Sequence, residues 1–153
     1  MRITHAFLGE HGVFYAQLAE LERAARDEDL AGLQRRAALL ASALASHARL
    51  EDELLFDFLE AGPGAEHPIL RMMREEHDEI ETALRAVQQV RDAARARELL
   101  LEMIRTARDH FEKEERVVFP LAEDALSEAE QHRLGERWAG ARGVRLAEAA
   151  ARP

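Results

Sequence analysis

Cysteine is absent from this 153-residue sequence. Without cysteine sulfur the chain cannot form a disulfide framework, a thiolate zinc site or an iron–sulfur cluster. Long apolar runs are absent too: none approaches the roughly 20 residues of a membrane-spanning helix, and the N-terminal residues have no signal-peptide pattern. We therefore expect a cytoplasmic protein without a membrane partner.

Glycine and proline are scarce, at 8 and 4 residues, and aromatic residues make up 5% of the chain. Hydrophobic residues nevertheless reach 47%, which is enough for a buried core. Alanine, leucine, arginine and glutamate are abundant, and because all four are strong helix formers we predict an all-α fold. Acidic residues outnumber basic ones and give a net charge of −9, which argues against nucleic acid as a partner.

Four long segments have an apolar residue at every third or fourth position, as in a helix with one buried face. This spacing predicts helices over residues 4–26, 30–60, 68–91 and 95–119. Four such helices with short connections favour an antiparallel up-down-up-down four-helix bundle, which we assign to residues 1–125. Residues 126–153 should add a short helix, opened by a capping box at Ser127 and reaching Trp138, and a tail.

The ends of the predicted helices have their own signals. Thr4 and the acidic residues at 27–29 are expected to cap the first and second helices, because short polar side chains accept hydrogen bonds from free backbone N–H groups. Gly62-Pro63-Gly64 should end the second helix. Pro120 should close or kink the fourth helix, because proline cannot donate a backbone hydrogen bond.

Histidine and glutamate stand four residues apart at two places on the predicted buried faces. His47 and Glu51 are in the second helix, and His110 and Glu114 are in the fourth. Residues i and i+4 lie on one side of a helix, about 5–6 Å apart at Cβ. Each pair therefore presents one imidazole and one carboxylate to a common point.

The first and third helices each add a histidine on the buried face, His11 and His77. Glu81 follows His77 by one turn, on the flank of that face. Tyr15 holds the corresponding position after His11, where it could be a core aromatic that hydrogen-bonds near the site, or a ligand. The two halves of the chain are thus partial repeats that differ at Tyr15 and Glu81.

These positions predict a metal site in the core of the bundle. Three of the side chains are carboxylates, and burying them without a partner would be costly, so we infer that multivalent cations supply the missing charge. Seven ligands are too many for one tetrahedral zinc but suit two octahedral-like metals with bridging glutamates. The candidate ligands are His11, His47, Glu51, His77, Glu81, His110 and Glu114.

Mixed imidazole and carboxylate ligands suit iron, manganese or zinc. We favour iron, because such sites with open positions support redox and dioxygen chemistry. A ferritin-like site needs glutamate three residues before histidine. No histidine in this sequence has that neighbour, so the ferritin-like arrangement is disfavoured.

The order and spacing of these residues resemble the hemerythrin family, in particular its bacterial HHE cation-binding branch. The resemblance spans roughly residues 4–121. It rests on the lone His11, the pair His47-x-x-x-Glu51, the segment Glu76-His77 to Glu81, and His110-x-x-x-Glu114 with Phe119-Pro120. It implies a four-helix bundle holding two non-haem irons with an oxo or hydroxo bridge. It further implies that Glu51 and Glu114 bridge, that His11 and His47 hold one iron, and that His77, Glu81 and His110 hold the other.

Two positions depart from the oxygen carriers of that family. The carriers have histidine where this sequence has Glu81, and their fourth-helix carboxylate occupies the position of Glu115 instead of Glu114. A third carboxylate should favour the ferric state, so reversible oxygen carriage is less well supported than metal binding. We expect a protein that binds dioxygen or another small diatomic for sensing, storage or carriage. Peroxide or nitric-oxide turnover, and plain metal binding or iron storage, stay open as alternatives.

Overall fold

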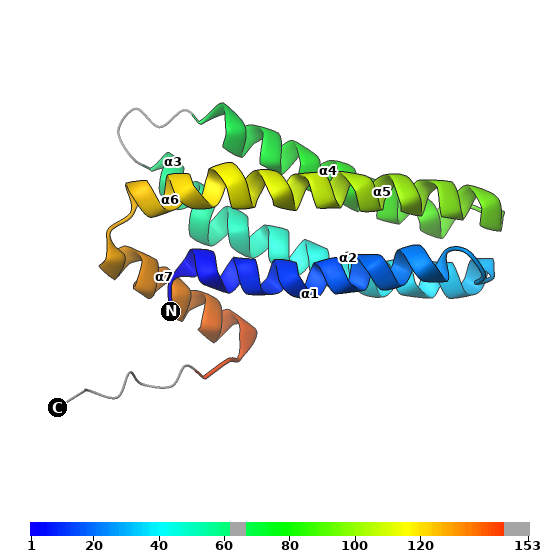
Figure 1. The fold of residues 1–153 in the computed structure, drawn as a ribbon, viewed down its shortest axis with the longest axis horizontal. Helices are drawn as coiled ribbons and strands as arrows, with labels where there is room; N and C mark the ends of the chain where they lie inside the picture. The colour runs from blue at the N-terminus through cyan, green and yellow to red at the C-terminus, as the bar shows by residue number, and fades with distance from the viewer. Residues whose placement is uncertain (62–66, 146–153) are drawn as a thin grey trace.

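Four long helices form the body of the molecule. A computed structural model describes residues 1–61 and 67–145. The helices run alternately in opposite directions (Figure 1), and this arrangement confirms the predicted up-down-up-down bundle. They are α1 (Ile3–Ala24), α2 (Leu30–Glu51), α4 (Pro68–Gln89) and α5 (Ala93–Lys113). None of the described helices is long and apolar enough to cross a membrane.

Two of the four helices continue through a π-helical turn. Helix α2 passes through η1 (Asp52–Phe56) into α3 (Asp57–Glu60), and α5 passes through η2 (Glu114–Val118) into α6 (Phe119–Ala125). Pro120 was predicted to close or kink the fourth helix: it does not close it, because the helix continues to Ala125, and a kink stays a prediction. The amide that proline lacks would bond within η2, where the regular α-helical pattern is already interrupted, so the helix can continue past it.

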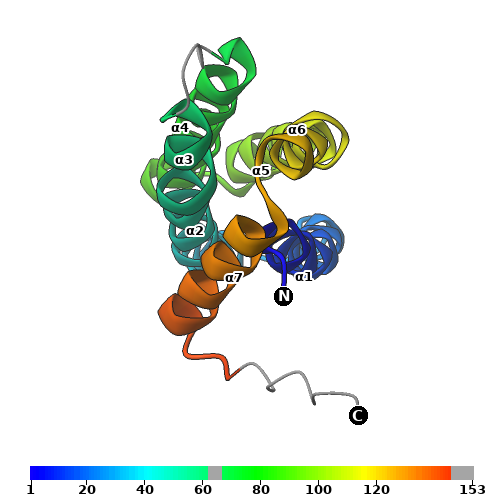
Figure 2. The same cartoon turned by 90° about the vertical axis from the view of Figure 1, so that its left-hand side faces the viewer.

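A further helix, α7 (Glu128–Arg142), crosses one end of the bundle and contacts α1 and η1 (Figure 2). The predicted capping box is present, because the Ser127 hydroxyl accepts from the Glu130 amide and the Glu130 carboxylate accepts from the Ser127 amide. The helix passes the predicted end at Trp138 and stops at Gly143, whose φ of 66° is left-handed. The division between residues 125 and 126 stays a prediction.

The other helix ends agree only in part with those predicted from the sequence. Asp29 caps α2, where its carboxylate accepts from the Gly32 amide at 2.8 Å. The cap predicted at Thr4 is wrong: Arg2 occupies that position, and the Thr4 hydroxyl donates to Glu123 at 2.9 Å, which joins α1 to α6. The predicted stop at Gly62-Pro63-Gly64 and the tail beyond residue 145 lie outside the described residues.

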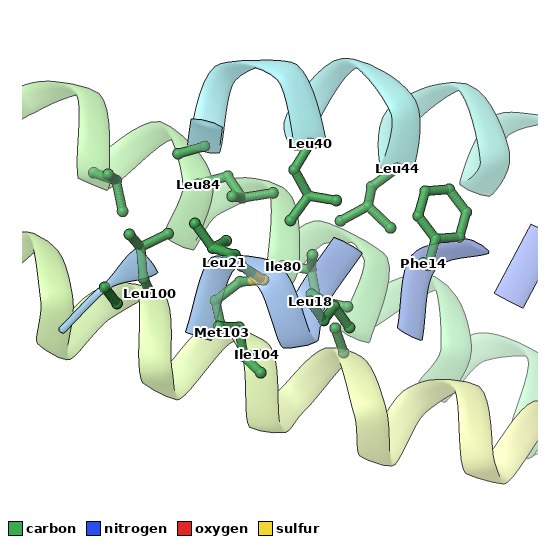
Figure 3. Close-up of a cluster of buried hydrophobic side chains, with 14 of the residues drawn as sticks. Phe14, Leu18, Leu21, Leu40, Leu44, Ile80, Leu84, Leu100, Met103 and Ile104 are labelled. Carbon is green, nitrogen blue, oxygen red and sulfur yellow. The ribbon is translucent and has the colours of Figure 1, made fainter. Parts of the chain in front are cut away.

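Two apolar clusters fill the bundle. One includes Leu18, Leu84, Leu100 and Met103 (Figure 3). The positions of its residues along the helices place it toward the α1–α2 and α4–α5 connections. The other lies toward α6 and α7; its members include Ile3, Phe7, Leu55, Phe56, Met73 and Phe119. Along each helix the predicted histidine ligand lies where residues of one cluster give way to residues of the other. The polar site is therefore enclosed by apolar side chains on both sides.

Candidate metal centre

Each long helix carries one histidine to the boundary between the two apolar clusters. His11, His47 and His110 are at most 1% exposed, and Glu51 and Glu114 are completely buried. The side chain of His77 is 10% exposed. The three- and four-residue spacing of the apolar faces explains this placement, because each ligand occupies a position of the buried face.

Both π turns begin directly after or at a buried glutamate. η1 follows Glu51 and η2 starts with Glu114. A π turn contains one residue more than an α turn and so shifts the buried face by one position. Val117 would continue the three- and four-residue spacing after His110 and Glu114, but it is 47% exposed, and Val118 is buried in its place. The same shift leaves Phe58 half-buried and buries Leu59.

The inward-facing atoms form two groups that share both glutamates. Within each group the ligand atoms all lie within 4.8 Å of one another. The first group is His11, His47, Glu51 and Glu114, and the second is His77, His110, Glu51 and Glu114.

The inward-facing nitrogens approach the carboxylates closely without hydrogen-bonding to them. Nε2 of His47 lies 3.1 Å from Glu51 Oε2, and Nε2 of His110 lies 3.3 Å from Glu114 Oε1. Among the described residues, neither these nitrogens nor the oxygens of Glu51 and Glu114 have a hydrogen-bond partner. Ligands about 2.1 Å from one metal ion and at right angles to each other are roughly 3 Å apart. The residues therefore fit two neighbouring cations that share the two carboxylates.

The outward-facing nitrogen of each histidine lies toward a carboxylate from another helix. His47 Nδ1 donates to Glu10 at 2.6 Å, His11 Nδ1 to Glu115 at 3.0 Å and His110 Nδ1 to Glu76 at 3.0 Å. His77 Nδ1 lies 3.8 Å from Asp52, beyond hydrogen-bonding distance. A proton held on Nδ1 leaves Nε2 free to bind a cation and keeps the ring in place.

The roles of these outer carboxylates were not predicted from the sequence, although their positions in the chain follow a pattern. Every outer carboxylate is adjacent in the chain to an inward-facing side chain, so one short segment supplies both a candidate ligand and a carboxylate directed at a histidine of another helix. The four adjacent pairs are Glu10-His11, Glu51-Asp52, Glu76-His77 and Glu114-Glu115.

The outer carboxylates have further partners of their own. Glu10 accepts from Trp138 and Arg142, Glu76 from Lys113, and Glu115 from the Tyr15 hydroxyl at 3.2 Å. Asp52 lies 3.5 Å from Arg74. Tyr15 thus reaches the site through Glu115, which contacts His11, and lies outside both ligand groups.

Glu81 is the one predicted ligand that lies apart from the other six. Its side chain is 49% exposed and lies 3.3 Å from Arg85. It belongs to neither ligand group, although it borders the same cavity as His77. Its role as a ligand, like the roles of the other six residues, stays a prediction.

The buried carboxylates favour protonated histidines at the centre when no cation is bound. Burial alone would lower the pKa of His11, but the carboxylates of Glu114 and Glu51 raise it to about 10. Burial also opposes charge on His47, yet Glu51 and Glu10 raise its pKa to about 9. Burial would raise the pKa of Glu51, but the surrounding histidines hold it well below its usual range. Cation binding must therefore displace protons from the histidines.

A cavity of about 370 Å³ lies between α2 and α4 and reaches the centre. His47, His77, His110 and Phe111 line its inner part, and exposed acidic residues such as Glu81 border its mouth. A small molecule in this cavity would meet the second ligand group, because both histidines of that group line it.

A family model described as the hemerythrin HHE cation binding domain matches residues 2–122, and a second match covers residues 69–147. The first match contains all four bundle helices and both ligand groups. No curated protein and no solved structure matches the chain. The family model covers most of the sequence, and with the His/Glu groups it identifies a metal-binding module. The chain belongs to the hemerythrin HHE cation-binding domain family.

Proposed function

We propose that this chain holds two iron ions and binds dioxygen or another small diatomic at one of them. His11 and His47 would hold one iron, His77 and His110 the other, and Glu51 and Glu114 would bridge both. The observation that supports this assignment is the pair of ligand groups that share both glutamates, with inward atoms that lack hydrogen bonds among the described residues. Iron in such a ligand set supplies redox chemistry and affinity for diatomic molecules.

The side chains around the centre would keep its geometry and exclude water. The outer carboxylates hold three of the four imidazoles by hydrogen bonds. Aromatic rings cover the histidines, with Phe111 at 4.3 Å from His11 and Phe56 stacked at 6.0 Å from His77 (centroid distances). A buried, apolar surround prevents hydrolytic side reactions and strengthens charge interactions inside the site.

Small-ligand binding is proposed at the metal position of His77 and His110. Both of these histidines line the cavity between α2 and α4, whereas only His47 of the other position does. His77 is also the least constrained of the four, because its nearest outer carboxylate is 3.8 Å away. We propose Glu81 as a further ligand here, reached by rotation of its side chain away from Arg85. In that position it would compete with the small ligand.

Turnover of peroxide or nitric oxide is the second candidate function. The observation that favours it is the presence of Asp78 and Glu81 beside the cavity that reaches His77 and His110. Carboxylates at that place could deliver or accept protons during a reaction, as general acids and bases do.

Reconstitution with ferrous iron under anaerobic conditions tests the proposal. We expect two irons per chain and a charge-transfer absorption band that appears with dioxygen and disappears when dioxygen is removed. An irreversible ferric state that decomposes peroxide would favour the enzyme instead. Binding of zinc alone, without iron uptake, would contradict both. The matched control is His132→Ala. This substitution removes an exposed histidine on α7 and should keep the iron content of the parent chain.

A further inference from the structure

Helix α7 lies outside the bundle, yet two of its side chains reach the candidate metal centre through one carboxylate. Glu10 Oε1 accepts from Trp138 Nε1 at 2.9 Å and from Arg142 Nε at 2.6 Å. Glu10 Oε2 accepts from Arg142 Nη2 at 2.9 Å and from His47 Nδ1 at 2.6 Å. A single carboxylate thus joins α7 to a predicted ligand.

The position of α7 is set by close packing at the N-terminus of α1. A Cβ at Gly135 would lie 2.1 Å from the Met1 carbonyl oxygen, so only glycine allows this approach. The buried Gln131 side chain donates to the Ala122 carbonyl at 3.1 Å and fixes α7 against α6. Arg142 also donates to Ser46 on α2 at 2.5 Å. Movement of α7 would therefore change the support of Glu10.

The second ligand group has no comparable support from α7 in the described part of the chain. The carboxylate behind His110 is Glu76 on α4, and its cationic partner is Lys113 on α5. Both belong to the bundle itself. The two predicted metal positions thus differ in what holds their histidines.

We propose that Arg142 and Trp138 are positioning residues of the metal centre, and that through Glu10 and His47 the placement of α7 controls how tightly the His11–His47 position retains its cation. This inference rests on the proposed di-metal function. Arg142 and Trp138 keep the Glu10 carboxylate against His47 Nδ1, and that contact orients the ring and increases the electron density that Nε2 offers to a cation. The His77–His110 position has no such hydrogen-bonded link to α7 among the described residues, so we expect α7 to affect it less.

Release of iron to a chelator measures the two positions separately. The ferrous form of the full chain would be mixed anaerobically with excess chelator, and the release followed by absorbance. We expect two phases from the parent chain. Arg142→Gln and Trp138→Phe should each accelerate the same phase by at most about tenfold. Loss of the carboxylate that contacts a ligating histidine costs about 10–100-fold in metal affinity, and these two residues act through that carboxylate. Lys113→Gln should accelerate the other phase.

Two glycines on α7 give a test that leaves the side chains around Glu10 unchanged. Gly135→Ala pushes α7 away from Met1 and should accelerate the same phase as Arg142→Gln. Gly140→Ala is the control, because no heavy atom lies within 4 Å of its added Cβ. Trp138 is the only tryptophan, so its fluorescence reports whether α7 has moved in Gly135→Ala. Circular dichroism would establish that every variant keeps its helices.

The outcomes distinguish this inference from the proposed function. A parent chain that takes up no iron would overturn the di-iron proposal and this inference with it. A parent chain with two irons, and α7 variants that release both at the parent rates, would overturn the role of α7 alone. Equal acceleration of both phases would also contradict it, because that result indicates general loosening of the bundle.

Discussion

At the residue scale, the centre is built from adjacent pairs of side chains. His11 and His77 face inward while the preceding Glu10 and Glu76 face histidines on other helices. Neighbouring positions on a helix point about 100° apart, since a turn holds 3.6 residues. One segment can therefore supply a ligand to the centre and a support to an adjacent helix.

The shared glutamates should matter more for metal content than any single histidine. Glu114 belongs to both ligand groups, whereas His47 belongs to one. We expect Glu114→Ala to lose both irons and His47→Ala to lose mainly one, with a lower melting temperature in the presence of iron for each. Elemental analysis of iron per chain measures this. Glu112→Ala changes an exposed carboxylate on the same helix and should retain two irons; retention by either ligand variant would refute the assignment.

Glu81 gives a second prediction at this scale. If its carboxylate binds the metal held by His77, Glu81→Gln removes a negative ligand, so the reduction potential should rise and the absorption band with dioxygen should shift. Iron content should stay at two per chain. Glu79→Gln, an exposed change on the same helix, is the control. Identical potentials and spectra in both variants would restrict Glu81 to its ion pair with Arg85.

At the scale of elements, the π turns decide which side chains face the core beyond each glutamate. Without η2, Val117 would continue the buried face that Glu114 occupies; with it, Val118 does so. η1 acts in the same way after Glu51. The two halves of the bundle share this irregularity at the same point, next to the centre. A π turn at a functional site is a recurrent feature of helical proteins.

Two neighbouring valines test this shift directly. Val117→Ala should change the free energy of unfolding by less than about 0.5 kcal/mol, because the residue is exposed. Val118→Ala should cost about 2 kcal/mol, since it removes two buried methyl groups. Chemical denaturation of the metal-free protein measures both values. The reverse order would mean that the helix stays regular through this segment.

At the scale of the whole molecule, the buried charges make the stability of the metal-free protein depend on pH. His11 and His47 have folded pKa values of about 10 and about 9, above the ordinary 6.5. A raised pKa means that the folded state binds the proton more tightly than the unfolded state does. This stabilisation is complete below about pH 6.5 and is lost as the pH rises through 9 to 10.

Thermal unfolding at a series of pH values measures this effect. We expect the melting temperature of the metal-free protein to fall between pH 6.5 and 10. The iron-loaded protein should show a much weaker dependence over that range, because the cations and not the protons then neutralise Glu51 and Glu114. Equal slopes for the two forms would contradict the exchange of protons for metal.

Much of the fold and most of the site could be predicted from the sequence. Apolar spacing predicted the four long helices, and it also placed His11, His47, Glu51, His77, His110 and Glu114 on buried faces. The physical reason is that helix periodicity is a local property, readable from the chain itself. The resemblance to the hemerythrin family was confirmed by the family model.

Contacts between distant segments were decided only by the tertiary structure. Thr4 does not cap α1. Its hydroxyl donates instead to Glu123, which is 119 residues away in the sequence but adjacent in the folded chain. Glu10 became a link between α7 and His47 because Arg142 and Trp138 fold back onto α1. The π turns were not predicted either, because a π turn changes which positions of the helix face the core and leaves no signal in the residue types of the segment. The sequence by itself determined the helices and the histidines and glutamates of the candidate site. Only the packing of the helices decided which carboxylate supports which histidine, because those partners meet across the bundle.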